Sequence, residues 1–183
     1  MRYHARMMNV PPRYVLTGGP CAGKTTLIEE LALRGYATVA EAARLVIEEE
    51  LAAGHTLDHI RSHPDWFQKV VDRVRLLEAE LPADHDDPVF LDRGVPDSVA
   101  YHRLSGTPIG TMLAAALEEK LYRKIFLLDL VDFERDGART ETPEETERIH
   151  ALIGEAYREL GYDVLTVPVM PVPARADFIL ANL

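Results

Sequence analysis

The chain has 183 residues, 47% of them hydrophobic and 27% charged, so it can bury one sizeable core and is too apolar to be disordered. Its 20 basic and 30 acidic residues leave a formal net charge of −10, which argues against a duplex nucleic-acid partner because phosphate backbones would be repelled. The single cysteine excludes an internal disulfide, and neither a membrane span nor a secretory signal is visible, so we expect a cytoplasmic protein.

In chain order, the pattern predicts a mobile leader at residues 1–12, followed by alternating short apolar strands and helices. Strands are expected at 13–17, 36–39, 89–92, 124–128 and 163–167. Helices are expected at 24–34, 41–53, 65–81, 96–104, 110–121, 143–160 and 175–183, with a polar irregular connector at 55–64. This alternation indicates an α/β fold in which a five-stranded parallel sheet is covered by helices on both faces. We expect residues 13–183 to form a single domain.

A glycine-rich loop follows the first predicted strand and matches the P-loop (Walker A) pattern G-x-x-x-x-G-K-[ST] at every fixed position. Such a loop directs successive backbone N–H groups at phosphate oxygens, and the helix behind it adds its positive N-terminal dipole. The expected nucleotide-binding residues are Gly18, Gly19, Pro20, Cys21, Ala22, Gly23, Lys24, Thr25 and Thr26. Lys24 would reach the β- and γ-phosphates, and the Thr25 hydroxyl would bind Mg²⁺, so we expect ATP and Mg²⁺ as cofactors.

A second acidic position helps to separate the classes of P-loop protein. Asp92 ends the buried strand at 89–92, where its carboxylate would hold metal or accept a proton. Mechanical ATPases usually place a glutamate next, but here Arg93 follows, and arginine cannot accept a proton. The chain also lacks the Asn-Lys-x-Asp tetrapeptide with which GTPases read guanine. The pattern favours a small-molecule kinase, with a surface ion pair between Asp92 and Arg93 as the structural alternative.

Two further groups of residues are candidates for the acceptor side and for a lid. Glu41 and Arg44 are three residues apart on one helical face, where they would form the wall of an acceptor pocket or simply an exposed ion pair. Arg135 and Arg139 bracket a glycine in a charged loop at 133–142. Such cations would neutralise a transferred phosphoryl group as the loop closes, although a solvated charged loop is the alternative.

The segments 17–27, 41–44, 91–101 and 136–140 together resemble the NadR-like AAA-domain ATPase/kinase family, which includes the ribosylnicotinamide-kinase domain of a bifunctional NAD-biosynthesis regulator. The likeness runs from about Tyr14 to Leu180. It implies a nucleoside-kinase-like sheet in which residues 92–101, with Asp97 and Tyr101, face the acceptor. In nucleoside kinases the helix expected at 65–81 flanks the base, so Gln68 is a further candidate for substrate contact.

The function that we predict is transfer of the γ-phosphoryl group of ATP to a hydroxyl of a small nucleoside-like metabolite. Lys24 and Thr25 would hold the donor with Mg²⁺, and Asp92 would orient or deprotonate the acceptor hydroxyl or anchor the metal. Arg93, Arg135 and Arg139 would share the transition-state charge. The alternative is a nucleotide-dependent regulatory ATPase that has no small-molecule acceptor.

Overall fold

The computed structural model describes residues 11–81, 86–131 and 142–183. Residues 1–10 of the expected leader and residues 133–141 of the expected lid loop therefore lie outside the described part of the chain.

The described residues form a five-stranded sheet in the order β2-β3-β1-β4-β5. Every neighbouring pair of strands is parallel, as the alternation of strands and helices predicts. The strands are β1 (Arg13–Thr17), β2 (Ala37–Val39), β3 (Val89–Asp92), β4 (Lys124–Leu128) and β5 (Val164–Val167). The register pairs Leu16 of β1 with Asp92 of β3, so both strands end at the same edge of the sheet.

The helices of the described chain are α1 (Lys24–Leu33), α2 (Ala42–Ala52), α3 (Leu57–Ser62), α4 (Trp66–Ala79), α5 (Asp97–Ser105), α6 (Thr111–Glu118), α7 (Pro143–Glu159) and α8 (Val172–Leu180). Seven of them match helices predicted from the sequence, but α3 is a correction to the irregular connector expected at 55–64. The Thr56 side chain caps this short helix by accepting a hydrogen bond from the His59 N–H. Helix α8 also begins three residues before the predicted start, with a proline in its first turn.

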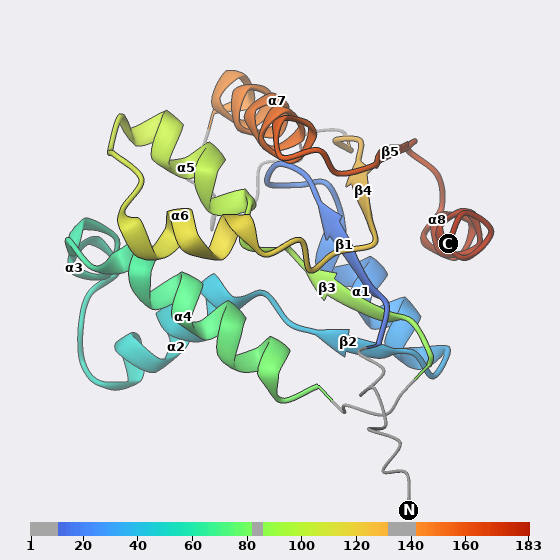
Figure 1. Cartoon of the computed structure of the whole chain (residues 1–183), viewed down its shortest axis with the longest axis horizontal. Helices are drawn as coiled ribbons and strands as arrows, with labels where there is room; N and C mark the ends of the chain where they lie inside the picture. Colours follow the sequence, from blue (N-terminus) through green and yellow to red (C-terminus); the bar gives the residue numbers. More distant parts are fainter. Residues whose placement is uncertain (1–10, 82–85, 132–141) are drawn as a thin grey trace, which may run out of the picture.

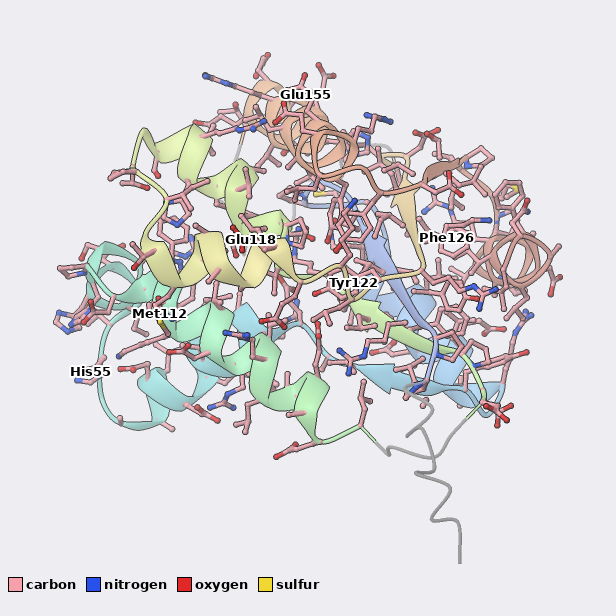
Figure 2. The ribbon with its side chains drawn as sticks, in the orientation of Figure 1. His55, Met112, Glu118, Tyr122, Phe126 and Glu155 are labelled. Atoms are coloured by element: carbon pink, nitrogen blue, oxygen red, sulfur yellow. The ribbon has the colours of Figure 1, made fainter. Side chains whose placement is uncertain are left out.

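Two layers of apolar side chains cover the sheet, because alternate residues of a strand point to opposite faces. Tyr14 and Leu16 pack with side chains of α1 and α8, whereas Val15 packs with side chains of α5 and α7 on the other face. Figures 1 and 2 show these layers, with Phe126 of β4 in the layer that contains α8. A third apolar cluster joins α2, α4 and α6. In the described part of the chain, no helix has both the length and the apolar character that crossing a bilayer requires.

Candidate active site

The loop between β1 and α1 holds the predicted phosphate-binding residues. Gly18 has a φ of 140°, and a Cβ at this position would lie 2.8 Å from the Leu128 carbonyl oxygen, so the close approach to β4 requires glycine. Cys21 has a φ of 66°, a left-handed conformation that costs roughly 1–2 kcal/mol for a residue with a side chain. Such strain is typical of functional loops, where the surrounding structure maintains it.

Helix α1 begins directly after this loop and leaves its first donors available. Its first backbone hydrogen bond runs 3.2 Å from the Leu27 N–H to the Gly23 carbonyl. The N–H groups of Lys24, Thr25 and Thr26 precede that bond, so they have no acceptor within the helix. A helix N-terminus of this kind attracts phosphate through its donors and its dipole.

Lys24 is buried and turns back over the loop. Its Nζ donates to the carbonyl oxygens of Gly18 at 3.1 Å and Gly19 at 2.9 Å. Burial and the neighbouring Arg93 cation lower the pKa of Lys24 to about 8, although the carboxylates of Asp92 and Glu41 partly oppose this shift. The ammonium group is therefore still mostly protonated at neutral pH.

Asp92 meets the loop at the end of β3. Its Oδ2 accepts a hydrogen bond of 3.3 Å from the Thr25 hydroxyl. Its Oδ1 is buried and has no hydrogen-bond partner in the described part of the chain. Burial raises the pKa of this carboxyl, the nearby Glu41 raises it further, and Lys24 and Arg93 act against the increase.

An unpartnered buried oxygen is costly unless a ligand, proton or metal satisfies it. The Asp92 carboxylate and the Thr25 hydroxyl are hard oxygen donors, the kind that Mg²⁺ prefers. Magnesium is usually bound by one or two such groups together with phosphate oxygens, so these two residues fit that ion. The structure brings together both residues predicted to hold the metal.

Arg93 is more tightly engaged than the sequence suggested. Its Nε donates to Glu41 at 2.9 Å, and its Nη1 donates to Asp97 at 2.8 Å and to the Gly18 carbonyl at 3.3 Å. The guanidinium carbon also lies 5.7 Å from the ring centroid of Tyr101, within the range of a cation–π contact. Arg93 itself has a left-handed φ of 72°. It therefore links the phosphate loop to two carboxylates in addition to any contact with phosphate.

Glu41 differs from Asp92 in the direction of its pKa shift. Burial alone would raise the pKa of Glu41, but Arg93 and Lys24 outweigh burial and lower it. The two carboxylates that lie beside the loop are thus separated in acidity by their surroundings. Such a pair is typical of sites where one group accepts a proton and the other stays ionised.

Asp97 is saturated by hydrogen bonds from the protein itself. In addition to Arg93, the Thr17 hydroxyl and the Tyr157 hydroxyl each donate to it at 2.6 Å, and the Gly94 N–H donates at 3.1 Å. These hydrogen bonds tie Asp97 to Arg93, to the end of β1 and to α7, and the acceptor contact that the resemblance implied stays a prediction.

The remaining predicted site residues differ in how close they lie to the phosphate loop and its carboxylates. Arg44 is exposed on α2 and contributes a positive charge beside Glu41, whereas Gln68 on α4 donates to Asp72 of the same helix at 2.7 Å. Tyr101 lies next to Arg93, as described above. Arg135 and Arg139 lie outside the described residues.

His150 contacts the loop and was not a candidate from the sequence. It lies on α7, and its Nδ1 accepts a hydrogen bond of 3.3 Å from the Gly19 N–H. Burial lowers the pKa of His150, and the Lys24 and Arg158 cations lower it further against the effect of Asp129. No local motif marks this position, because the contact exists only once α7 packs on the loop, 131 residues away in the chain.

These features define a P-loop kinase-like fold: a glycine-rich loop between β1 and α1, and an acidic residue at the end of the adjacent parallel strand β3. Residues 13–175 match the model of a family described as "AAA domain". The chain belongs to this family, and its fold is that of the NadR-like P-loop kinases.

Solved structures support this assignment of the fold. The structure of NadR in complex with NR has a TM-score of 0.69 against this chain at 16% identity, and the match covers 94% of this chain and 50% of that chain. Thymidylate kinase from Ehrlichia chaffeensis gives 0.64 at 11% identity, with 94% and 98% covered. Shikimate kinase from Acinetobacter baumannii gives 0.55 at 18% identity, with 96% and 94% covered. No curated protein matches, and at these identities the similarity shows the fold alone.

Proposed function

We propose that this protein is an ATP-dependent kinase that phosphorylates a hydroxyl group of a small nucleoside-like metabolite in the cytoplasm. The observation that carries the proposal is the pair formed by Thr25 and Asp92. A carboxylate with one unpartnered buried oxygen lies beside the phosphate loop, and its pKa is raised. This group is available to a metal ion or to an acceptor hydroxyl at the place where the γ-phosphate would lie.

On the donor side, the first-turn N–H groups of α1 would bind the β-phosphate, and Lys24 would leave the carbonyl oxygens of its own loop to contact the phosphates. Magnesium, when bound by Thr25 and Asp92, would neutralise phosphate charge. Positioning and electrostatics carry most of the catalysis in such reactions, so the protein has little covalent chemistry to perform.

On the acceptor side, the hydroxyl oxygen forms a bond to the γ-phosphorus while the bond from that phosphorus to the β–γ bridging oxygen breaks, releasing ADP. The hydroxyl proton passes to a carboxylate. Where Asp92 does not itself bind Mg²⁺, it is the better acceptor of that proton, because its pKa in the metal-free site is raised whereas the pKa of Glu41 is lowered. Glu41, held ionised by Arg93, would instead orient the acceptor or stabilise the guanidinium.

The names of the neighbouring structures support a small acceptor and an ATP-like donor. The shikimate kinase structure contains shikimate, and one NadR structure contains NAD and AMP-PNP. We extend these properties to the present chain as part of the proposal. Tyr101, Arg44 and Gln68 would line the acceptor side, and Arg135 and Arg139 would bring positive charge to the transferred phosphoryl group.

The proposal is tested by a metabolite screen for ATP consumption with Mg²⁺ present, followed by mass spectrometry of the products. A kinase consumes ATP slowly alone, accelerates with its acceptor and yields a product heavier by one phosphoryl group. The variant Lys24→Met is the control for background hydrolysis. Absence of ATP binding by calorimetry would contradict nucleotide use. ATP turnover stimulated only by a macromolecule would instead favour a regulatory ATPase.

A further inference from the structure

Arg175 is a buried cation that contacts the rear of the phosphate loop. It lies on α8 and is only 3% exposed. Its guanidinium donates to three backbone carbonyl oxygens: Ala22 at 2.7 Å, Asp129 at 2.9 Å and Pro168 at 2.9 Å. Ala22 belongs to the phosphate loop, and the other two residues directly follow β4 and β5. One side chain therefore joins the loop that follows β1 to the carboxyl ends of β4 and β5.

Burying the charged guanidinium of Arg175 is unfavourable in free energy compared with burying an apolar side chain. Removing a guanidinium from water costs several kcal/mol unless every donor finds a good acceptor. Arginine can meet that requirement at three carbonyl oxygens because its planar fork carries five donors in fixed directions. A methionine would occupy a similar volume without the desolvation cost, so packing alone does not explain an arginine at this position.

The sequence contains a signal for this residue. Val172, Arg175, Ala176 and Ile179 follow the i, i+3, i+4, i+7 spacing of a buried helix face, and Arg175 is the charged member of that set. Its partners could not be read from the sequence, because the Ala22 carbonyl lies 153 residues away in the chain.

The bond to Ala22 constrains the direction of a phosphate-binding donor. In a planar trans peptide, the carbonyl of one residue and the N–H of the next point in opposite directions. The Ala22 carbonyl points at Arg175, so the Gly23 N–H points away from the guanidinium. Gly23 also has a left-handed φ of 77°, and a Cβ there would lie 3.5 Å from Arg175 Nη1. The arginine thus lies against the loop on the side opposite that donor.

We propose that Arg175 is a positioning residue for phosphate binding: it holds the Ala22–Gly23 peptide so that the Gly23 N–H faces the bound phosphate, and it ties this peptide to the chain that follows β5. This inference rests on the proposed function, because it requires a nucleotide in the loop. Without the guanidinium, the Ala22–Gly23 peptide is free to rotate. Phosphate binding must then restore its orientation, which lowers the affinity.

The test compares Arg175→Met, Arg175→Lys and the control Arg34→Met by calorimetric titration with ATP and with inorganic pyrophosphate, both with Mg²⁺. Arg34 also anchors α8, because it bonds to Asp177 at 2.5 Å and to the Pro173 carbonyl at 3.0 Å, but neither of these groups belongs to the phosphate loop. Thermal denaturation of each variant shows whether it is folded at the temperature of the titration.

We expect Arg175→Met to lose about tenfold in affinity for both ATP and pyrophosphate, which corresponds to about 1.4 kcal/mol. Arg175→Lys should fall between that variant and the unaltered protein, because a single ammonium cannot reach all three carbonyl oxygens. Arg34→Met should bind both probes as the unaltered protein does. An equal loss in pyrophosphate and ATP places the effect on the phosphate side of the nucleotide, and the thermal denaturation excludes an unfolded fraction, which would lower both affinities alike.

Unaltered affinity in either folded Arg175 variant would overturn the inference while leaving the proposed function intact. An equal loss of affinity in Arg34→Met would also overturn it, because the effect would then come from the docking of α8. If the unaltered protein binds neither ATP nor pyrophosphate, the proposed function itself fails, and the role of Arg175 fails with it. Should Arg175→Met not fold, Arg175→Lys decides the outcome.

Discussion

The Thr25 hydroxyl donates a hydrogen bond of 3.3 Å to Oδ2 of Asp92 and thereby links the start of α1 to the end of β3. The two residues are 67 positions apart in the chain. They meet because β1 and β3 are parallel neighbours whose carboxyl ends share one edge of the sheet. The other oxygen of Asp92 remains unpartnered among the described residues, which makes this pair the centre of the proposed chemistry.

Asp92→Asn should abolish most phosphoryl transfer, because the amide can neither accept a proton nor neutralise a metal ion. We expect kcat to fall by about 10²–10³ once the acceptor is known, while much of the affinity for ATP remains. Steady-state kinetics and calorimetry on the same preparation measure the two effects. Near-full activity of Asp92→Asn would contradict Asp92 as the proton acceptor and favour Glu41 instead. The matched variant Glu41→Gln would then test that role.

ATP affinity should fall as the pH rises through about 8, the pKa of Lys24 in the free protein. Bound phosphate favours the charged ammonium and so raises its pKa, which means that binding is full below the free pKa and weakens above it. A phosphate group, whose second pKa is about 6, does not itself titrate in this range. Calorimetry from pH 7 to pH 9.5 should show the decline. Lys24→Met should bind about 10- to 100-fold more weakly at pH 7 and show a flatter profile.

Asp97→Ala should destabilise the fold by about 3–5 kcal/mol, because it leaves Arg93, Thr17 and Tyr157 without their shared buried acceptor. Urea denaturation measures the change. The control is Asp177→Ala, whose side chain is 71% exposed and pairs with Arg34 at the surface, and which should cost about 0–1 kcal/mol. Similar losses in the two variants would contradict the positioning role that the hydrogen bonds give to Asp97.

His150 should make stability fall at mildly acidic pH. Burial lowers its pKa in the folded state, so the unfolded chain, with an ordinary histidine pKa of about 6.5, binds the proton more readily. The contribution is therefore complete above pH 6.5 and is lost as the pH falls below that value. His150→Asn keeps an acceptor for the Gly19 N–H but does not titrate. Its unfolding free energy should fall less steeply between pH 7 and pH 5.5, and parallel profiles would contradict this prediction.

Local sequence patterns were enough to predict the strands, most of the helices and the phosphate loop, because these features depend on residues that are neighbours in the chain. Short apolar runs and the helical spacing of apolar residues predict which segments pack, and the glycines of residues 18–23 can be recognised wherever the loop lies. The position of Asp92 also followed from the sequence, since the carboxyl ends of parallel strands meet at one edge. Helix α3 was missed because its six residues are too short for a periodic signal and depend on the Thr56 cap.

The partners of the charged groups, by contrast, depend on how the helices and strands pack in three dimensions. This packing shifted the pKa values of Asp92 and Glu41 in opposite directions, tied Arg93 to Asp97, and brought His150 and Arg175 against the phosphate loop. Each of these contacts forms only when packing brings the side chain and its partner together. In most of them the two residues lie far apart in the chain. Burial then sets the pKa of each group, because the energy of a charge depends on the surrounding water and neighbouring charges, which no local pattern records.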